Sequence, residues 1–344
     1  MAVYTTIDDA GAFFEIILYT GTGSSLGVTG AGFEPAFTWI KNRADGDFHV
    51  LTDAVRGATK YIKSDTTTAE TTDAESLKSF DSDGFTVGTQ NEVNTNTETY
   101  VGWNWKAGTT TGIAGSPSIT PASYSFNATS GFSVIKYVGN STGGATLPHG
   151  LGVAPQVIIV KNLTTAGTNW GVYSEAIGAT KYLVLDTDAV VDTATSLWND
   201  TAATSTLFSI GTSSIVNTNT DSYVAYCFTE ITGYSRFGSY EGNGNVNGTY
   251  VYTGFRPAFL MCKAVDSSGG WYMFDDKRAG YNVDNDTILA NTTAGDEGTD
   301  KIDILSNGFK LRHATDPNVA ETYIYMAFAN SPFVNSNGAP ANAR

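Results

Sequence analysis

Cysteine and histidine are scarce in this sequence. It contains two cysteines, Cys227 and Cys262, and three histidines. Each cysteine stands alone in an apolar run, which predicts two buried free thiols rather than a disulfide framework. The close Cys and His spacing of a zinc site does not occur, so we predict no metal site and no cofactor. No run approaches the roughly 18 apolar residues of a membrane helix, so we expect no membrane insertion.

Basic residues are also few. The 344 residues include 19 Lys and Arg against 34 Asp and Glu, a net charge of −15. Affinity for nucleic acid rests on clustered Lys and Arg, so this balance excludes a nucleic-acid partner. The N-terminus carries Asp8 and Asp9 without a basic residue, which argues against a signal peptide and favours synthesis in a cytoplasm.

Glycine and threonine are abundant, and aromatic residues make up 12% of the chain. Strands and turns favour this composition, whereas helix interiors disfavour it. Short apolar runs alternate with Gly, Asn, Asp and Thr turns, a spacing typical of sandwiches. We therefore expect an all-β protein with little helix, apart from one short helix around residues 69–80.

Two landmarks recur three times along the chain. The first is a proline followed by an apolar run and a lysine, and the prolines are Pro35, Pro155 and Pro257. The second is a strand that begins with tyrosine, at residues 100–105, 223–228 and 323–328. Their spacings agree, which indicates an internal repeat.

The repeat length is that of a small domain. We predict three tandem β-sandwich (jelly-roll-like) domains at residues 1–112, 113–232 and 233–334, here called repeats 1, 2 and 3, and a flexible tail at 335–344. Separate domains would hold Lys41, Lys161 and Lys263 in similar surroundings and would each close a core of their own. One continuous core through all three would contradict this interpretation.

The recurring strands suggest how each repeat is buried. Val101, Trp103 and Trp105 share one face of the closing strand, so that face is expected to cover a core. The proline strand is apolar on both faces, as in residues 157–160. It is either a central strand of a sandwich or a strand whose outer face packs on a neighbouring domain.

No residue grouping predicts catalysis, so we expect no catalytic residues and no enzyme. His49, His149 and His313 occupy non-equivalent positions, whereas a nucleophilic triad needs histidine beside serine or cysteine. Two acidic stretches, residues 81–84 and 284–286, are weak calcium candidates that are better explained as polar turns.

Two further groups of residues are candidates for a functional role. Asp53 and Arg56 recur as Asp275 and Arg278 but become Ser174 and Ile177 in repeat 2, which favours a turn cap with an ion pair over a catalytic carboxylate. Trp198, Asn199 and Asp200 form a polar, loop-like stretch without counterpart in the other repeats. They are the predicted contact site for a glycan.

The landmark motifs resemble a repeat family of tailed, often marine, bacteriophages. In repeat 1 the resemblance rests on residues 19–23, 32–43, 56–60, 80–85 and 94–106, and it continues through residues 149–155, 223–240 and 305–310. It implies a virion component of the tail or fibre type and carries over no catalytic residue.

The resemblance and the composition together predict a non-enzymatic virion structural protein made in the host cytoplasm. Its expected place is a tail fibre, tip or adaptor that attaches to the host. The expected partners are other virion proteins, further copies of itself, as a homotrimer, and a host surface glycan. Capsid-surface decoration and a polysaccharide depolymerase are the alternatives.

Overall fold

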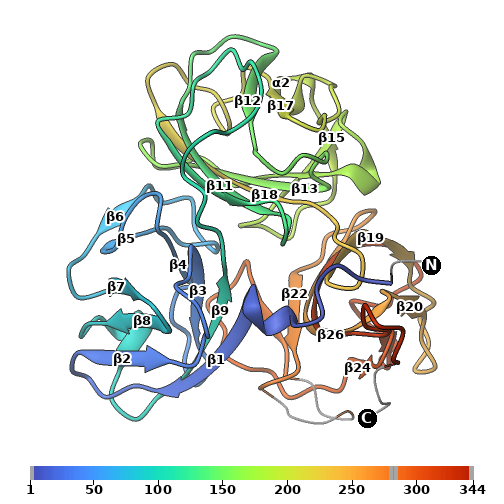
Figure 1. The fold of residues 1–344 in the computed structure, drawn as a ribbon. Helices are drawn as coiled ribbons and strands as arrows, with labels where there is room; N and C mark the ends of the chain where they lie inside the picture. The colour runs from blue at the N-terminus through green and yellow to red at the C-terminus, as the bar shows by residue number, and fades with distance from the viewer. Residues whose placement is uncertain (1–3, 279–281, 283–285, 341–344) are drawn as a thin grey trace.

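The computed structural model describes residues 4–278, 282 and 286–340, and nearly all of its regular structure is β. Three lobes surround a common centre (Figure 1), and they correspond to repeats 1, 2 and 3 in chain order. The prediction of an all-β fold is confirmed. None of the described helices has the length and apolar character needed to cross a bilayer.

Each repeat contains an inner sheet next to the centre and a smaller outer sheet. In repeat 1 the inner sheet has the order β1 (Phe14–Thr20), β9 (Thr99–Trp105), β3 (Phe37–Asn42) and β4 (Val50–Asp53). The outer sheet has the order β2 (Leu26–Thr29), β8 (Gly84–Val87) and β7 (Leu77–Asp81), and β5 (Lys60–Tyr61) pairs with β6 (Thr71–Thr72).

Repeats 2 and 3 share the order of the four central strands of this inner sheet and add strands at its edges. The inner sheet of repeat 2 has the order β10 (Ser123–Asn127), β11 (Phe132–Val138), β18 (Ser222–Phe228), β13 (Val157–Asn162), β14 (Gly171–Ser174), β15 (Lys181–Val184) and β16 (Asp192–Thr193), with β12 (Ala145–Pro148) and β17 (Leu207–Ile210) outside. That of repeat 3 has the order β19 (Ser235–Glu241), β26 (Thr322–Pro332), β21 (Phe255–Ala264), β22 (Trp271–Asp275) and β23 (Ile288–Leu289), with β20 (Tyr250–Tyr252), β25 (Gly308–Leu311) and β24 (Ile302–Leu305) outside.

The helices are single turns. They are η1 (Ala10–Ala12), α1 (Asn91–Asn94), η2 (Glu175–Ile177) and α2 (Thr195–Trp198). The helix expected around residues 69–80 is wrong, since β6 and most of β7 occupy that stretch. Leu77 instead pairs with Val87 across a tight hairpin whose turn is formed by Ser82 and Asp83. A bulge after Leu77 brings Leu77 and Phe80 to one face, so their spacing resembles that of a helix.

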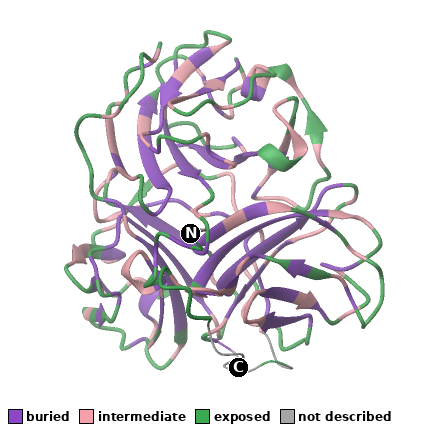
Figure 2. Cartoon of the chain, turned by 45° about the vertical axis from the view of Figure 1, so that its right-hand side comes forward, coloured by how far each residue is buried: buried purple, intermediate pink, exposed green. Residues whose placement is uncertain are grey.

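One apolar core runs through all three repeats. It includes Val101, Trp103 and Trp105 of β9 and the equivalent large residues of β18 and β26. The large face of each closing strand therefore covers a shared centre rather than the interior of its own repeat, as the buried colouring at the junction of the sheets shows (Figure 2). This continuous core contradicts the expectation that the three repeats close entirely separate cores, because the large faces of the closing strands pack against one another. The predicted domain boundaries remain a prediction.

In repeats 1 and 2 the opposite strand faces build smaller local cores, whereas in repeat 3 they belong to the same cluster as the shared centre. Tyr100 packs with the outer sheet of repeat 1, and Tyr223, Ala225 and Cys227 pack with that of repeat 2. The proline strands of repeats 1 and 2 are thus buried on both faces because one face lies in the local core and the other in the shared centre. Cys227 and Cys262 are buried free thiols, as predicted.

The prolines do not all precede their strands. Pro35 and Pro155 lie just before β3 and β13, as expected, but Pro257 lies inside β21. The β21–β26 register shifts on both sides of Pro257. A bulge tolerates the missing N–H, so the strand can extend past the proline.

The three landmark lysines have similar surroundings. Lys41, Lys161 and Lys263 are fully buried. Each ammonium group donates to a backbone carbonyl: that of Asn42 at 2.6 Å, of Thr168 at 2.6 Å and of Ala264 at 2.9 Å. Burial lowers the pKa of each lysine to about 8, although nearby carboxylates oppose the shift.

These lysines predict a rise in stability with pH. Between about pH 7.5 and about pH 8.5 the folded lysines lose protons that the unfolded lysines keep, so the free energy of unfolding should rise by about 0.5 kcal/mol per lysine. Above about pH 9 this rise should weaken and then reverse. Burial raises the pKa of Cys227 and Cys262 and of buried tyrosines such as Tyr137 and Tyr226, so only the unfolded thiols and phenols ionise there.

Urea unfolding at several pH values measures this rise. Lys161→Met should remove about a third of it, because it removes one of three contributions of equal sign. Lys181→Met, at an exposed position of β15, should leave the rise unchanged. An unaltered rise in Lys161→Met would contradict the assignment.

Candidate functional site

The predicted glycan site at Trp198, Asn199 and Asp200 is not a stacking surface. Trp198 is 1% exposed and belongs to the local core of repeat 2. Asn199 ends α2 in the left-handed conformation, and Asp200 accepts a hydrogen bond from Thr195 at 2.8 Å. The tryptophan is buried because Leu197 and Trp198 anchor the single-turn helix in the core. It therefore offers no ring face to a sugar.

The histidines have structural surroundings. His49 lies buried just before β4, where Nδ1 accepts from the Trp39 indole at 2.8 Å and Nε2 faces the Leu289 carbonyl at 3.1 Å. Burial lowers the pKa of His49 well below its ordinary value and that of His149 to about 4. Both therefore stay neutral at physiological pH, and His313 is half-buried after β25.

The acidic stretch at residues 81–84 forms a turn. Asp81 accepts hydrogen bonds from Ser79 and Thr86, and Asp83 accepts one from the Gly32 amide at 2.7 Å. Of the second stretch, Asp284 and Asn285 lie outside the described residues. No group of three or more metal-binding side chains occurs in the part of the chain that the structure describes.

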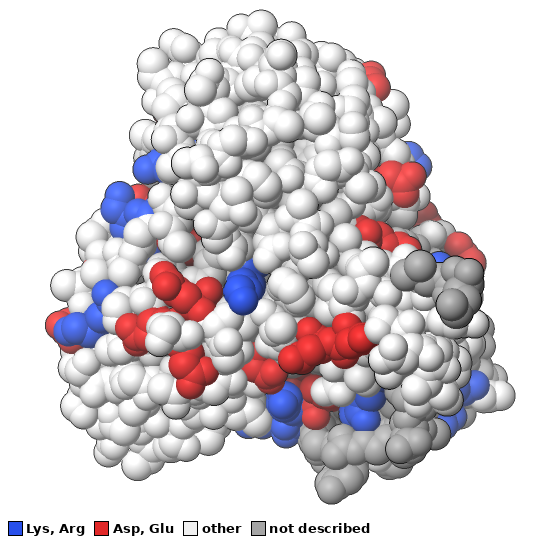
Figure 3. All heavy atoms as spheres, in the orientation of Figure 1, with Lys and Arg blue, Asp and Glu red and all other residues white. Residues whose placement is uncertain are grey.

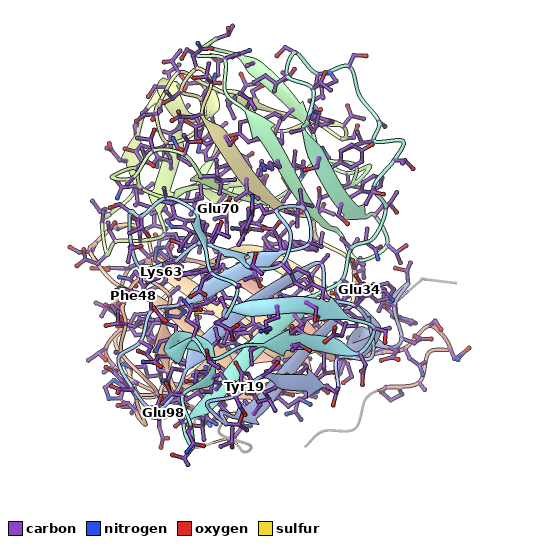
Figure 4. All side chains as sticks on the ribbon, turned by 90° about the vertical axis from the view of Figure 1, so that its left-hand side faces the viewer. Tyr19, Glu34, Phe48, Lys63, Glu70 and Glu98 are labelled. Carbon is purple, nitrogen blue, oxygen red and sulfur yellow. The ribbon has the colours of Figure 1, made fainter. Side chains whose placement is uncertain are left out.

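Asp53 and Arg56 form a fully buried ion pair, and Asp53 also caps the turn through the Arg56 amide at 2.8 Å. The ion pair lies at the junction of repeats 1 and 2, because the Tyr226 hydroxyl of repeat 2 donates a hydrogen bond to Asp53 at 2.8 Å. Arg56 also forms an ion pair with Glu70 at 3.5 Å. Glu70 lies on the side of repeat 1 next to repeat 2 (Figure 4). The predicted turn cap with an ion pair is confirmed.

The same arrangement recurs at the next junction around the ring. Asp275 pairs with Arg278 at 2.6 Å and accepts from the Trp103 indole of repeat 1 at 3.1 Å. At the third junction the residue equivalent to Tyr226 and Trp103 is Met326, which cannot donate. Ser174 and Ile177 replace the ion pair there. The charged pair is thus present where the neighbouring repeat supplies a hydrogen-bond donor.

A groove of about 560 Å³ opens at that third junction, between repeats 2 and 3. Its lining combines Tyr173 of β14, Glu175 of η2, Glu230 after β18 and Phe237 of β19 with loop residues around Pro155 and Ala202. This volume falls in the range of small-molecule sites. The groove is the candidate functional site.

Gln156 positions both carboxylate residues of the groove. Its backbone carbonyl accepts from the Glu175 amide at 2.8 Å, and its side-chain carbonyl accepts from the Glu230 amide at 2.7 Å. Partial burial raises the pKa of Glu230, and the charge of Glu175 raises it further against the opposing effect of Arg236. The groove therefore holds two carboxylates, of which Glu230 has a raised pKa.

The equivalent junction between repeats 3 and 1 is filled. Only about 30 Å³ remains there. Asp276 stands in place of Glu175 and contacts Asn330 at 2.9 Å and Arg256 at 3.5 Å, while Lys277 reaches Glu15 at 3.2 Å. The open groove between repeats 2 and 3 thus contrasts with the filled junction between repeats 3 and 1.

The sequence prediction came close to this groove without identifying it. Ala202 and Ala203 of its wall lie two and three residues after Asp200, and Trp198 packs edge-to-face against Tyr173 at 5.7 Å. Glu175 and Glu230 could have been noticed as carboxylates that the other repeats lack as a pair. Their closeness, however, depends on the register of β13, β14 and β18 within repeat 2.

The fold and the groove define an all-β protein of three related repeats around one core. The chain belongs to the family described as a domain of unknown function (DUF7483), which matches residues 9–332. No curated protein and no solved structure matches it.

Proposed function

We propose that this chain is a non-enzymatic structural protein of a tailed-bacteriophage virion, located in a tail fibre, tip or adaptor and engaged in host attachment. The support is the motif resemblance along the chain together with the use that the structure makes of those motifs. Their recurring lysines and aromatic residues fill the shared core. The observation that carries the proposal is this single core, which makes three repeats one rigid body that presents loops and junctions to partners.

Gold-labelled antibody on purified particles of the encoding phage tests the place of the chain. We expect label at the tail. Label over the head would favour capsid decoration, the alternative function, and particles without label would contradict a virion role. Light scattering coupled to size exclusion tests the proposed homotrimer, and a monomeric mass would contradict that part.

A polysaccharide depolymerase is the second candidate, because Glu175 and Glu230 share one groove. Glycosidases place two carboxylates of unequal proton affinity around the scissile bond. The raised pKa of Glu230 would suit a general acid.

We expect no reducing ends when the purified chain is incubated with host capsule or lipopolysaccharide. Release of reducing ends that falls about 100-fold or more in Glu230→Gln would contradict the non-enzymatic proposal. Glu241→Gln, an exposed glutamate outside the groove, is the matched control and should not alter any such release.

A further inference from the structure

Strand β20 of repeat 3 carries two tyrosines that have no counterpart in the equivalent strands β2 and β12. Tyr250 and Tyr252 are 43% and 50% exposed on either side of buried Val251. Val251 pairs with Phe309 as Val28 pairs with Phe85 and Leu147 with Phe208. The positions equivalent to the tyrosines are therefore Gly27 and Thr29 in repeat 1, and Thr146 and Pro148 in repeat 2. The equivalent strands of repeats 1 and 2 form with small residues at these positions, so the packing of the strand does not require tyrosines there.

The two tyrosines share the outward face of an edge strand. Side chains two residues apart in a strand are separated by about 6.6 Å along it. The residue opposite Tyr252 is Gly308, which has no side chain to cover the ring. Thr249 and Thr253 bond to β25 through Leu311 and Asn307, so by antiparallel alternation the backbone groups of both tyrosines face the open edge.

Two cations flank these rings. Lys310 lies directly opposite Tyr250 on the same face, and the Arg236 guanidinium lies 5.8 Å from the centre of the Tyr252 ring. Neither cation forms an ion pair with any residue that the structure describes, and Asp303, the other neighbour of Lys310, is paired with Arg312. Elsewhere acidic side chains dominate, as over the lower lobes in Figure 3.

We propose that Tyr250 and Tyr252, with Arg236 and Lys310, bind an acidic polysaccharide. The apolar C–H face of a pyranose ring matches an aromatic ring face, and the two cations supply charge complementarity to uronate carboxylates. Specific protein interfaces bury about 800 Å² per partner, far more than two side chains offer, which favours a sugar over a protein. Arg236 also acts on the pKa of Glu230, so the site borders the groove. Its biological meaning rests on the proposed attachment role.

Binding of the full chain to oligogalacturonate and alginate oligomers tests the site, with malto-oligosaccharides as the neutral comparison. We expect salt-sensitive binding of the acidic probes. The double variant Tyr250→Ala with Tyr252→Ala should weaken it about tenfold or more. The corresponding Phe variants keep the rings and should bind nearly as wild type. Thr29→Ala, at the equivalent position of repeat 1, is the matched control.

Three results would overturn the site: no binding of either acidic probe, binding that survives loss of both rings, or equal binding of the neutral probe. Unchanged thermal unfolding of the Ala variants separates lost binding from lost folding. The particle labelling is independent of this measurement. Tail label without binding overturns the site alone, and binding without label overturns the virion role alone.

Discussion

Asp53→Ala is expected to lower the free energy of unfolding by about 3–5 kcal/mol, because it removes the buried counter-charge of the Arg56 guanidinium and leaves only Glu70 at 3.5 Å. It also leaves the Tyr226 hydroxyl without its acceptor across the junction of repeats 1 and 2. Urea unfolding measures the loss. Asp73→Ala, a partly buried turn aspartate of the same repeat, is the comparison and should cost far less.

One junction of this chain packs the same positions without a buried charge. At the junction of repeats 2 and 3 the equivalent residues are Ser174, Ile177 and Met326. The triple variant Asp53→Ser, Arg56→Ile and Tyr226→Met places these residues at the junction of repeats 1 and 2. It removes the buried charge together with its partners, so it should be more stable than Asp53→Ala. A triple variant no more stable than the single one would contradict the account of the junctions.

Trp105→Ala should destabilise the whole molecule by about 3–5 kcal/mol, since it empties a large volume at the shared centre. The Trp105 ring lies 6.4 Å from Phe132 of repeat 2 and 5.6 Å from Phe328 of repeat 3, and it also packs on Phe14 and Phe37. Calorimetry should show one transition for the wild-type chain, and this transition should move as a whole to lower temperature in the variant.

Val138→Ala is the control for this measurement. Val138 is 44% exposed at the end of β11, so its truncation should leave the transition in place. Separate transitions in the wild-type chain, of which Trp105→Ala moves only one, would show that the repeats are independent domains and would contradict a shared core.

Local sequence rules succeeded where one interaction dominates. Period-two alternation predicted β9, β18 and β26, and the three-residue spacing of Asp53 and Arg56 predicted a turn cap. They failed where contacts between distant residues determine the structure. A bulge after Leu77 produced a spacing that resembles a helix, and the local core of repeat 2 buried Trp198. The groove was beyond reach because Gln156, Glu175 and Glu230 are distant in sequence and meet only through the register of β13, β14 and β18.

The sequence by itself determined the all-β architecture, the threefold recurrence and the buried free thiols, because these depend on composition and on the spacing of side chains along one strand. The tertiary structure alone decided what each strand face covers. Alternation assigns residues to two faces, but it does not say whether a face meets its own outer sheet or the neighbouring repeats. Here the larger residues meet the neighbours, since three inner sheets that close on one centre remove their large apolar faces from water.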